Sequence, residues 1–197
     1  MHSYSSDCPS RKYVPFGLAV VSILFAWGMS LAIAYLKIKS PWWVDIPSVM
    51  GFYGLGHELF ERYIWRFKLV RILRIVRTPD IKGVWKGHLK SSFDDFKSQK
   101  DIQIIIKQNW THLSIDAETK ESKSSSLIGA VLINDREKSE LIYEYFNEPK
   151  VIAKETMHSH RGTCHLVLKN DKLEGEFYSG RDRKNIGQIC VQKKEIN

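Results

Sequence analysis

Cysteine is scarce in this chain, and the cysteines present do not form a disulfide framework. The 197 residues hold three of them, Cys8, Cys164 and Cys190, which is an odd number. Small secreted domains with a limited core are usually cross-linked by several cystine pairs. The cysteine content therefore gives no indication of an oxidising compartment.

The common catalytic and nucleotide-binding motifs are also absent. The sequence has no glycine-rich phosphate loop, no Gly-x-Ser-x-Gly elbow and no His-Glu-x-x-His zinc motif. His158, His160 and His165 lie near Cys164, but no second cysteine or acidic ligand follows at the usual zinc spacing. We therefore expect a protein that is not an enzyme and that has no metal and no cofactor.

Two long apolar segments occupy the first third of the chain. The first, Val14–Leu36, has no charged residue, and at about 1.5 Å per residue it can cross a hydrocarbon core of about 30 Å. The second, Trp42–Trp65, has tryptophan at both ends, where amphipathic rings favour the headgroup region. It also carries ionisable residues: Asp45, His57, Glu58, Glu61 and Arg62. We expect transmembrane helices over residues 13–37 and 42–65.

A removable secretion signal is the alternative for the first segment, because Ala32-Ile33-Ala34 resembles a signal-peptidase site. The apolar run is longer than a usual signal core of about 7–15 residues, and another apolar segment follows at once. Both features favour a membrane helix.

Positive charge is concentrated beside the apolar segments. The chain has a net charge of +8, yet residues 91–197 contain 17 basic and 17 acidic residues. The C-terminal part is thus balanced, and we expect neither DNA nor RNA as a partner. Basic residues in the stretch 66–77, with Arg11 and Lys12, outweigh Lys37 and Lys39, and such residues stay on the cytoplasmic side. We expect a cytoplasmic tail over residues 1–12 and a cytoplasmic C-terminal domain.

A basic connector, residues 66–82, follows the second apolar segment. Its arginines at positions 71, 74 and 77 are three apart, which predicts one basic helical face with apolar residues opposite. Two interpretations stay open: an extension of the second helix, or an amphipathic stretch on anionic headgroups. Pro79 ends the helix in either case, because proline cannot continue the hydrogen-bond ladder.

From Gly83 onward the pattern is typical of short strands. We predict a membrane-anchored all-β protein whose residues 83–197 form an eight-stranded antiparallel up-and-down barrel, lipocalin-like, because closure removes exposed sheet edges. Asn170-Asp171 is a two-residue hairpin signal, since both residues tolerate positive φ. The expected strands are Gly83–Ser92, Ile102–Ile115, Ser124–Ile133, Glu140–Asn147, Val151–Ser159, Thr163–Lys169, Lys172–Ser179 and Ile186–Lys193.

Side-chain alternation indicates what the barrel interior contains. One face of the predicted fourth strand carries Tyr143, Tyr145 and Asn147, and one face of the first carries Trp85. Aromatic rings beside polar groups could stack on a flat ligand and bind its phosphates. A filled structural core with a polar rim is the alternative, and it would make the barrel an oligomerisation module. An all-aliphatic interior would instead indicate a membrane-anchored carrier or sensor of an apolar molecule.

Several short pieces of the chain occur in an order that is fairly specific. They are Pro41–Pro47, Gly51–Gly54, Gly83–Gly87, Gln108–Trp110, the serines Ser122, Ser124 and Ser126, Tyr143–Pro149, His160–Thr163 and Leu173–Arg181. In this order they resemble the transmembrane β-barrel effectors of CBASS, the cyclic-oligonucleotide-based anti-phage system, and the resemblance covers nearly the whole chain.

The resemblance implies a receptor and an effector in one chain. In that family a CD-NTase makes a cyclic di- or oligonucleotide, which the cytosolic barrel binds. The protein then forms a homo-oligomer, and its membrane segments disrupt the bacterial inner membrane, so that the infected cell dies. The implied location is multi-pass in the inner membrane.

The expected functional residues lie in both parts of the chain. In the membrane segments, Gly51 and Gly54 would allow close helix packing, and Glu58 and Glu61 would line a hydrated path or mark the cytoplasmic end. The expected ligand contacts are Trp85, Gln108, Trp110, Ser124, Ser126, Tyr143, Tyr145, Asn147, His160, Arg161, Thr163 and Arg181.

Overall fold

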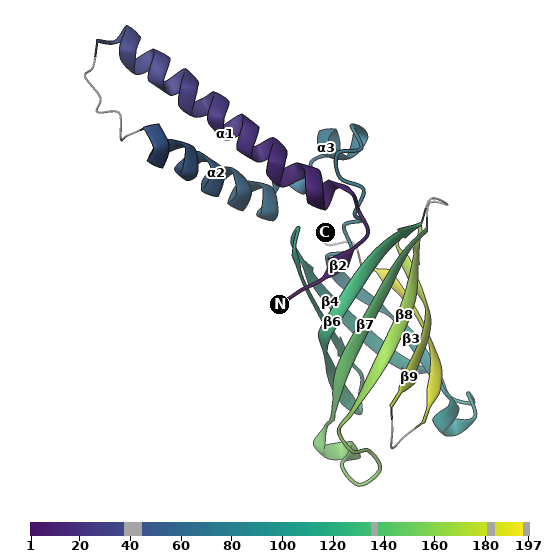
Figure 1. Cartoon of the computed structure of the whole chain (residues 1–197). Helices are drawn as coiled ribbons and strands as arrows, with labels where there is room; N and C mark the ends of the chain where they lie inside the picture. The colour runs from purple at the N-terminus through teal and green to yellow at the C-terminus, as the bar shows by residue number, and fades with distance from the viewer. Residues whose placement is uncertain (38–44, 135–137, 181–183, 195–197) are drawn as a thin grey trace. The chain divides into compact units, whose positions relative to one another are not determined.

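The computed structural model describes residues 1–37, 45–134, 138–180 and 184–194, which form two compact units (Figure 1). One unit combines Met1–Asp7 with Thr78–Asn197, and the other is Cys8–Arg77. Each unit is described by itself below.

The helical unit is built on two helices that lie side by side, α1 (Ser10–Tyr35) and α2 (Asp45–Arg62) (Figure 1). The ring centroids of Phe25 and Phe52 are 6.0 Å apart across this contact. A Cβ placed on Gly56 would lie 3.8 Å from the side chain of Leu18, so this glycine is at the contact as well.

The predicted first apolar helix is confirmed as α1. Within the described ranges it is the one helix long and apolar enough to cross a membrane. Its large apolar side chains are mostly exposed in this chain, with Phe16 at 73% and Trp27 at 63%. A helix in the core of a soluble protein would bury such residues, whereas a helix in lipid has no need to.

Helix α2 contains the four residues that were expected to act in the membrane. Gly51 and Gly54 are exposed, and a Cβ on either would meet nothing within 4 Å, so they do not mediate the contact with α1. Glu58 forms an ion pair with Arg62 one turn later, while Glu61 is 8% exposed. Part of the predicted second span, residues 42–44, lies outside the described residues.

The connector does not form the continuous helix that its arginine spacing predicted. The chain passes through a 3-10 turn, η2 (Ile64–Arg66), and a single short helix, α3 (Lys68–Ile72). Arg74 then has a positive φ of 54°, which an α-helix does not accommodate. Periodicity alone was misleading here, because a five-residue helix presents little more than one turn.

The second unit is a closed antiparallel barrel, as predicted. Neighbouring strands follow the order β5-β4-β3-β10-β9-β8-β7-β6, and pairing of β5 with β6 closes the circle. The strands are β3 (Gly83–Ser91), β4 (Lys100–Gln108), β5 (His112–Glu118), β6 (Ser122–Asn134), β7 (Lys138–Pro149), β8 (His160–Lys169), β9 (Lys172–Ser179) and β10 (Ile186–Lys193). The predicted hairpin is confirmed, since Asn170 and Asp171 have φ values of 45° and 58°.

The predicted number of strands is right, but two of the strands were placed wrongly. The expected strand Ile102–Ile115 is two strands, because the side chain of Asn109 accepts a 2.7 Å hydrogen bond from the His112 backbone N–H and forms a turn. The expected strand Val151–Ser159 is instead a 3-10 turn, η4 (Val151–Ala153), followed by a loop. One error adds a strand and the other removes one, so the number of barrel strands remains eight.

The N-terminal residues belong to the barrel rather than to a separate tail. β5 and β6 pair directly over three residues each, Asp116–Glu118 with Lys123–Ser125. Beyond that point two short strands fill the seam: β1 (His2–Ser3) pairs with β5, and β2 (Ser5–Ser6) pairs in parallel with β6. Tyr4, between them, is 4% exposed and is part of the barrel core.

Candidate ligand-binding cavity

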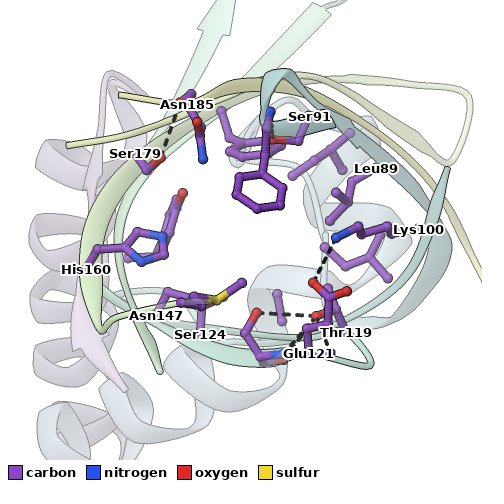
Figure 2. Close-up of a pocket in the computed structure, with 18 of the residues that line it drawn as sticks. Leu89, Ser91, Lys100, Thr119, Glu121, Ser124, Asn147, His160, Ser179 and Asn185 are labelled. Carbon is purple, nitrogen blue, oxygen red and sulfur yellow. Dashed lines mark hydrogen bonds and ion pairs between the residues drawn. The ribbon is translucent and has the colours of Figure 1, made fainter. Parts of the chain in front are cut away.

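A cavity opens at one end of the barrel, which we call the open end (Figure 2). Its buried lining includes apolar and aromatic side chains, among them Ile102, Tyr143, Cys164 and Ile189, each no more than 6% exposed, and also three buried polar residues, Ser122, Asn147 and Ser179. Polar side chains surround the opening in Figure 2: Ser91, Lys100, Ser124, Asn147, His160, Ser179 and Asn185. The lining thus combines apolar and aromatic side chains with polar groups, some of them buried and some at the opening.

Two tyrosines on β7 form the aromatic wall of the cavity. Tyr143 and Tyr145 are two residues apart and therefore point to the same side of the strand, with ring centroids 6.3 Å apart. Gly162 on β8 makes room for the second ring, because a Cβ there would lie 2.4 Å from Tyr145 side-chain atoms. Burial raises the pKa of the Tyr143 hydroxyl well above its usual value and raises the pKa of the neighbouring Cys164 thiol to about 12. Both groups are therefore neutral at physiological pH.

Lys100 is a cation at the opening, and the protein holds it by two contacts. Its Nζ lies 2.8 Å from Oε2 of Glu121 and 5.9 Å from the ring centroid of Phe93. All three residues line the cavity, with Phe93 supplied by a 3-10 turn, η3 (Ser92–Asp94). An anion that enters the opening would therefore meet a lysine whose present partner is a carboxylate.

The loop after η4 supplies a further part of the rim. It carries Met157, whose Sδ accepts a hydrogen bond of 3.3 Å from Nδ2 of Asn147. Nδ1 of His160 lies 2.9 Å from the backbone oxygen of His158. Both Asn147 and His160 border the cavity, so the loop that had been expected to be a strand positions cavity side chains instead.

The structure brings together five of the twelve predicted ligand contacts. Ser124, Tyr143, Tyr145, Asn147 and His160 all line the cavity. All five are at inward positions near the open end, as alternation along β6, β7 and β8 requires.

Trp85, Gln108 and Trp110 were expected in the site but lie at the opposite end of the barrel, which we call the closed end. They are 0%, 3% and 3% exposed. The indole N–H of Trp85 donates to the backbone oxygen of Ile81 at 2.9 Å, and Gln108 bonds to backbone groups as well. Trp85 and Gln108 face inward as expected, but at the end of the barrel where the core is filled, and Trp110 is buried in the turn between β4 and β5.

Three further residues that were predicted to contact the ligand do not line the cavity and interact with other parts of the barrel. Ser126 Oγ accepts a 2.9 Å hydrogen bond from the Ile115 N–H, at the point where β5 and β6 separate. Arg161 is exposed and pairs with Glu144 at 3.6 Å, and Thr163 stands beside Glu144 in the register of β7 and β8. Arg181 lies outside the described residues.

The structure also adds cavity residues that sequence reasoning missed. Lys100, Glu121 and Phe93 come from positions that had been assigned to turns. Extending the alternation of β4 backward from Ile102 would have identified Lys100. No local pattern marks Glu121, whose place depends on the turn between β5 and β6. The histidines do not converge: His165 is on the outside, 3.0 Å from Glu140, while His160 faces the cavity.

A closed barrel with an aromatic and polar cavity at one end, joined in one chain to a membrane-type helix, is the architecture of a membrane-associated ligand-binding protein. Comparison with family models identifies the particular family. Residues 76–193 match the model described as "Cap15, cyclic dinucleotide receptor domain", and residues 12–66 match "Cap15, TM helices". The chain therefore belongs to the CBASS-associated Cap15 family and is a membrane protein.

Curated relatives agree with this assignment. The chain is 28% identical over 155 residues to CD-NTase-associated protein 15 of Staphylococcus schleiferi, with 77% of this chain and 80% of the relative covered. It is 24% identical over 155 residues to the protein of the same name from Yersinia aleksiciae, covering 77% and 72%. The corresponding protein of Escherichia albertii is 21% identical over 144 residues, covering 70% and 74%.

Proposed function

We propose that this protein is a CBASS effector whose barrel binds a cyclic dinucleotide at the open end, whereupon the chains oligomerise and their helices disrupt the inner membrane. It acts as a receptor rather than as an enzyme. A CD-NTase supplies the ligand, and both ends of the multi-pass chain are in the cytoplasm. The observation that carries the proposal is the mixed lining of the cavity, in which tyrosine and aliphatic residues lie beside polar groups.

This mixed lining fits the two chemical parts of a cyclic dinucleotide. Bases stack on aromatic rings and form hydrogen bonds through their edges, which matches Tyr143, Tyr145 and Asn147. Phosphates prefer cationic and N–H or O–H donors, which the rim offers through Lys100 and Ser124. The cavity volume of about 130 Å³ is below the roughly 300–1,000 Å³ of most small-molecule pockets. A base would therefore enter the cavity while the phosphates stay at the rim.

Electrostatics gives the rim a role in selectivity. Lys100 is held by Glu121, so a ligand must offer enough negative charge to replace that carboxylate. A dianionic cyclic dinucleotide does so, whereas a neutral apolar molecule does not. The polar residues within the buried lining, Ser122, Asn147 and Ser179, favour the receptor over a carrier of apolar molecules, and the cavity argues against a filled structural barrel.

The membrane step is supported by the helical unit. The exposed apolar surface of α1 suits lipid or a second copy of the helix. Gly51 and Gly54 on α2 have open space around them, so another helix could approach closely. A ligand that binds the oligomer more tightly than the monomer would shift the chains toward this assembly.

The test uses the full-length chain in detergent, because residues 1–7 are part of the barrel. Calorimetric titration with cyclic di- and trinucleotides is expected to show micromolar or tighter binding of at least one of them. Dye uptake is then measured in cells with and without an active CD-NTase, and uptake is expected only with the enzyme. Absence of binding across the panel, or uptake that is independent of the enzyme at normal expression, would contradict the proposal.

A further inference from the structure

The barrel is joined to the helical unit at two places along the chain, after Asp7 and before Thr78. Any influence of the barrel on the helices that travels through the chain must pass one of these joins. The barrel side of the first join is the strand segment His2–Asp7, and that of the second is Thr78–Lys82.

One buried side chain is hydrogen-bonded to both segments. Gln108, the last residue of β4, is 3% exposed. Its Nε2 donates to the hydroxyl of Tyr4 at 3.3 Å and to the backbone oxygen of Pro79 at 3.1 Å. Its Oε1 accepts from the backbone N–H of Ile81 at 2.9 Å. A single amide therefore links the first segment to the second.

Each segment has anchors of its own, but these anchors do not connect the two. The carboxylate of Asp7 accepts two hydrogen bonds from the Ile133 N–H, at 2.9 and 3.1 Å. In the other segment, the backbone oxygen of Ile81 accepts from Trp85 and that of Asp80 accepts from Lys193. Gln108 differs from them because it bridges the two segments.

The strand that ends at Gln108 begins in the cavity. β4 starts with Lys100 at the rim, and Ile102 also lines the cavity. Ile104 and Ile106, at 0% and 1% exposed, continue the same inward face to Gln108. A ligand that draws Lys100 away from Glu121 therefore acts on the strand that holds both joins.

We propose that Gln108 is a positioning residue that couples the ligand cavity to both connections with the helical unit, a role that rests on the proposed receptor function. It holds the two segments in one arrangement, so that a shift of β4 moves them together. The buried location explains why an amide is needed: it supplies donors and an acceptor without a charge to desolvate.

Three variants separate the parts of this role. Gln108→Met keeps the approximate size and removes all three hydrogen bonds. Tyr4→Phe removes the bond to the N-terminal segment and leaves the second segment bonded. Gln103→Met is the matched control, because Gln103 is on the outward face of the same strand and is half-buried.

The experiment measures hydrogen exchange, ligand affinity and dye uptake on the full-length protein. In Gln108→Met, we expect the backbone amides of residues 2–7 and 80–82 to exchange about tenfold faster or more, while Tyr4→Phe affects residues 2–7 alone. Nucleotide affinity should stay within about threefold of wild type. Ligand-dependent dye uptake should fall about tenfold or more in Gln108→Met, fall less in Tyr4→Phe, and stay unchanged in Gln103→Met.

Other results would overturn the inference. Wild-type uptake in Gln108→Met despite faster exchange would show that the link carries no signal, and uptake without ligand would show a restraint rather than a coupling. Lost affinity in both Gln108→Met and Tyr4→Phe would assign Gln108 to the integrity of the cavity. Failure of the proposed function is distinguishable, because wild type itself would then show no ligand-dependent uptake, while the exchange measurements would still report whether Gln108 holds both segments.

Discussion

The two ends of the barrel contain similar residues in different situations. At the closed end Trp85, Trp110 and Gln108 are buried, and the polar atoms of Trp85 and Gln108 bond to the chain's own backbone. At the open end Tyr145 and Lys100 border a cavity. An aromatic or amide side chain that faces the interior is therefore part of a filled core or of the cavity lining, depending on its position along the barrel axis. Changes at the closed end should alter stability, and changes at the open end should alter affinity.

The largest expected effect is at the closed end. Trp85→Ala removes a fully buried indole, and such truncations cost about 3–5 kcal/mol of unfolding free energy. Because domains are stable by only about 5–15 kcal/mol, this loss should remove a large part of the stability of the barrel. Denaturant titration followed by β-sheet circular dichroism measures the change. Trp85→Phe is the milder control and should lose less. A stable Trp85→Ala protein with weakened nucleotide binding would contradict the expectation that changes at the closed end alter stability rather than affinity.

At the open end, Tyr145→Leu keeps an apolar side chain but removes the ring. Stacking on an aromatic side chain contributes about 1–3 kcal/mol per base, so affinity should fall about tenfold or more. Calorimetry on the full-length protein measures this, with thermal unfolding recorded in parallel. The matched control is Tyr178→Leu, because Tyr178 is 54% exposed on the outside of the barrel. Equal affinities of the two variants would remove Tyr145 from the binding site.

The ion pair at the rim should give two opposite and smaller effects. Lys100→Met removes a cation and leaves Glu121 facing the ligand, so affinity should drop about tenfold, since a hydrogen bond to a charged group contributes about 1.5–3 kcal/mol. Glu121→Gln removes the competing carboxylate and should tighten binding. Titrations at two salt concentrations test the electrostatic origin. Lys97→Met removes an exposed lysine nearby and should leave the nucleotide affinity unchanged at both salt concentrations. A loss of affinity equal to that of Lys100→Met would indicate a general charge effect.

The smallest expected effect concerns thiol chemistry inside and outside the barrel. Burial raises the pKa of Cys164 from its ordinary value of 9.0 to about 12, so at pH 8 its reactive thiolate is about 1 in 10,000 molecules. Alkylation in the folded protein should therefore be much slower at Cys164 than at the half-buried Cys190, and mass spectrometry of labelled peptides compares them. In denaturant the two rates should converge.

The raised pKa of Cys164 also makes the stability of the folded protein depend on pH. The folded state holds the Cys164 proton more tightly than the unfolded state, so its contribution to stability is present below pH 9 and is lost as pH rises toward 12. Cys164→Ala should reduce this alkaline loss. Rapid labelling of Cys164 in the folded protein would show that the thiol, although it is 0% exposed, is accessible to the reagent through the cavity.

Local patterns were sufficient for much of the architecture. The apolar run of α1 and the Asn170-Asp171 turn are each encoded within a short stretch, and the structure has both as predicted. Alternation along β7 correctly placed Tyr143, Tyr145 and Asn147 on the inside. Alternation cannot specify how far along the barrel a residue lies, however, and for that reason Trp85 and Gln108 were assigned to a site whose cavity they do not line.

What only the tertiary structure decided depends on segments far apart in the chain. The N-terminal residues read as a polar tail because two-residue strands leave no periodic signal, and they gain their place from the gap between β5 and β6. Glu121 reaches Lys100, and Tyr4 reaches Gln108, through barrel closure. The sequence by itself determined a membrane helix, a barrel of short strands and its inward faces, since these follow from hydrophobicity and period. The fold decided which inward residues meet a cavity and which meet the backbone, because closing the barrel sets the height of each residue and satisfies the polar atoms of one end within the protein.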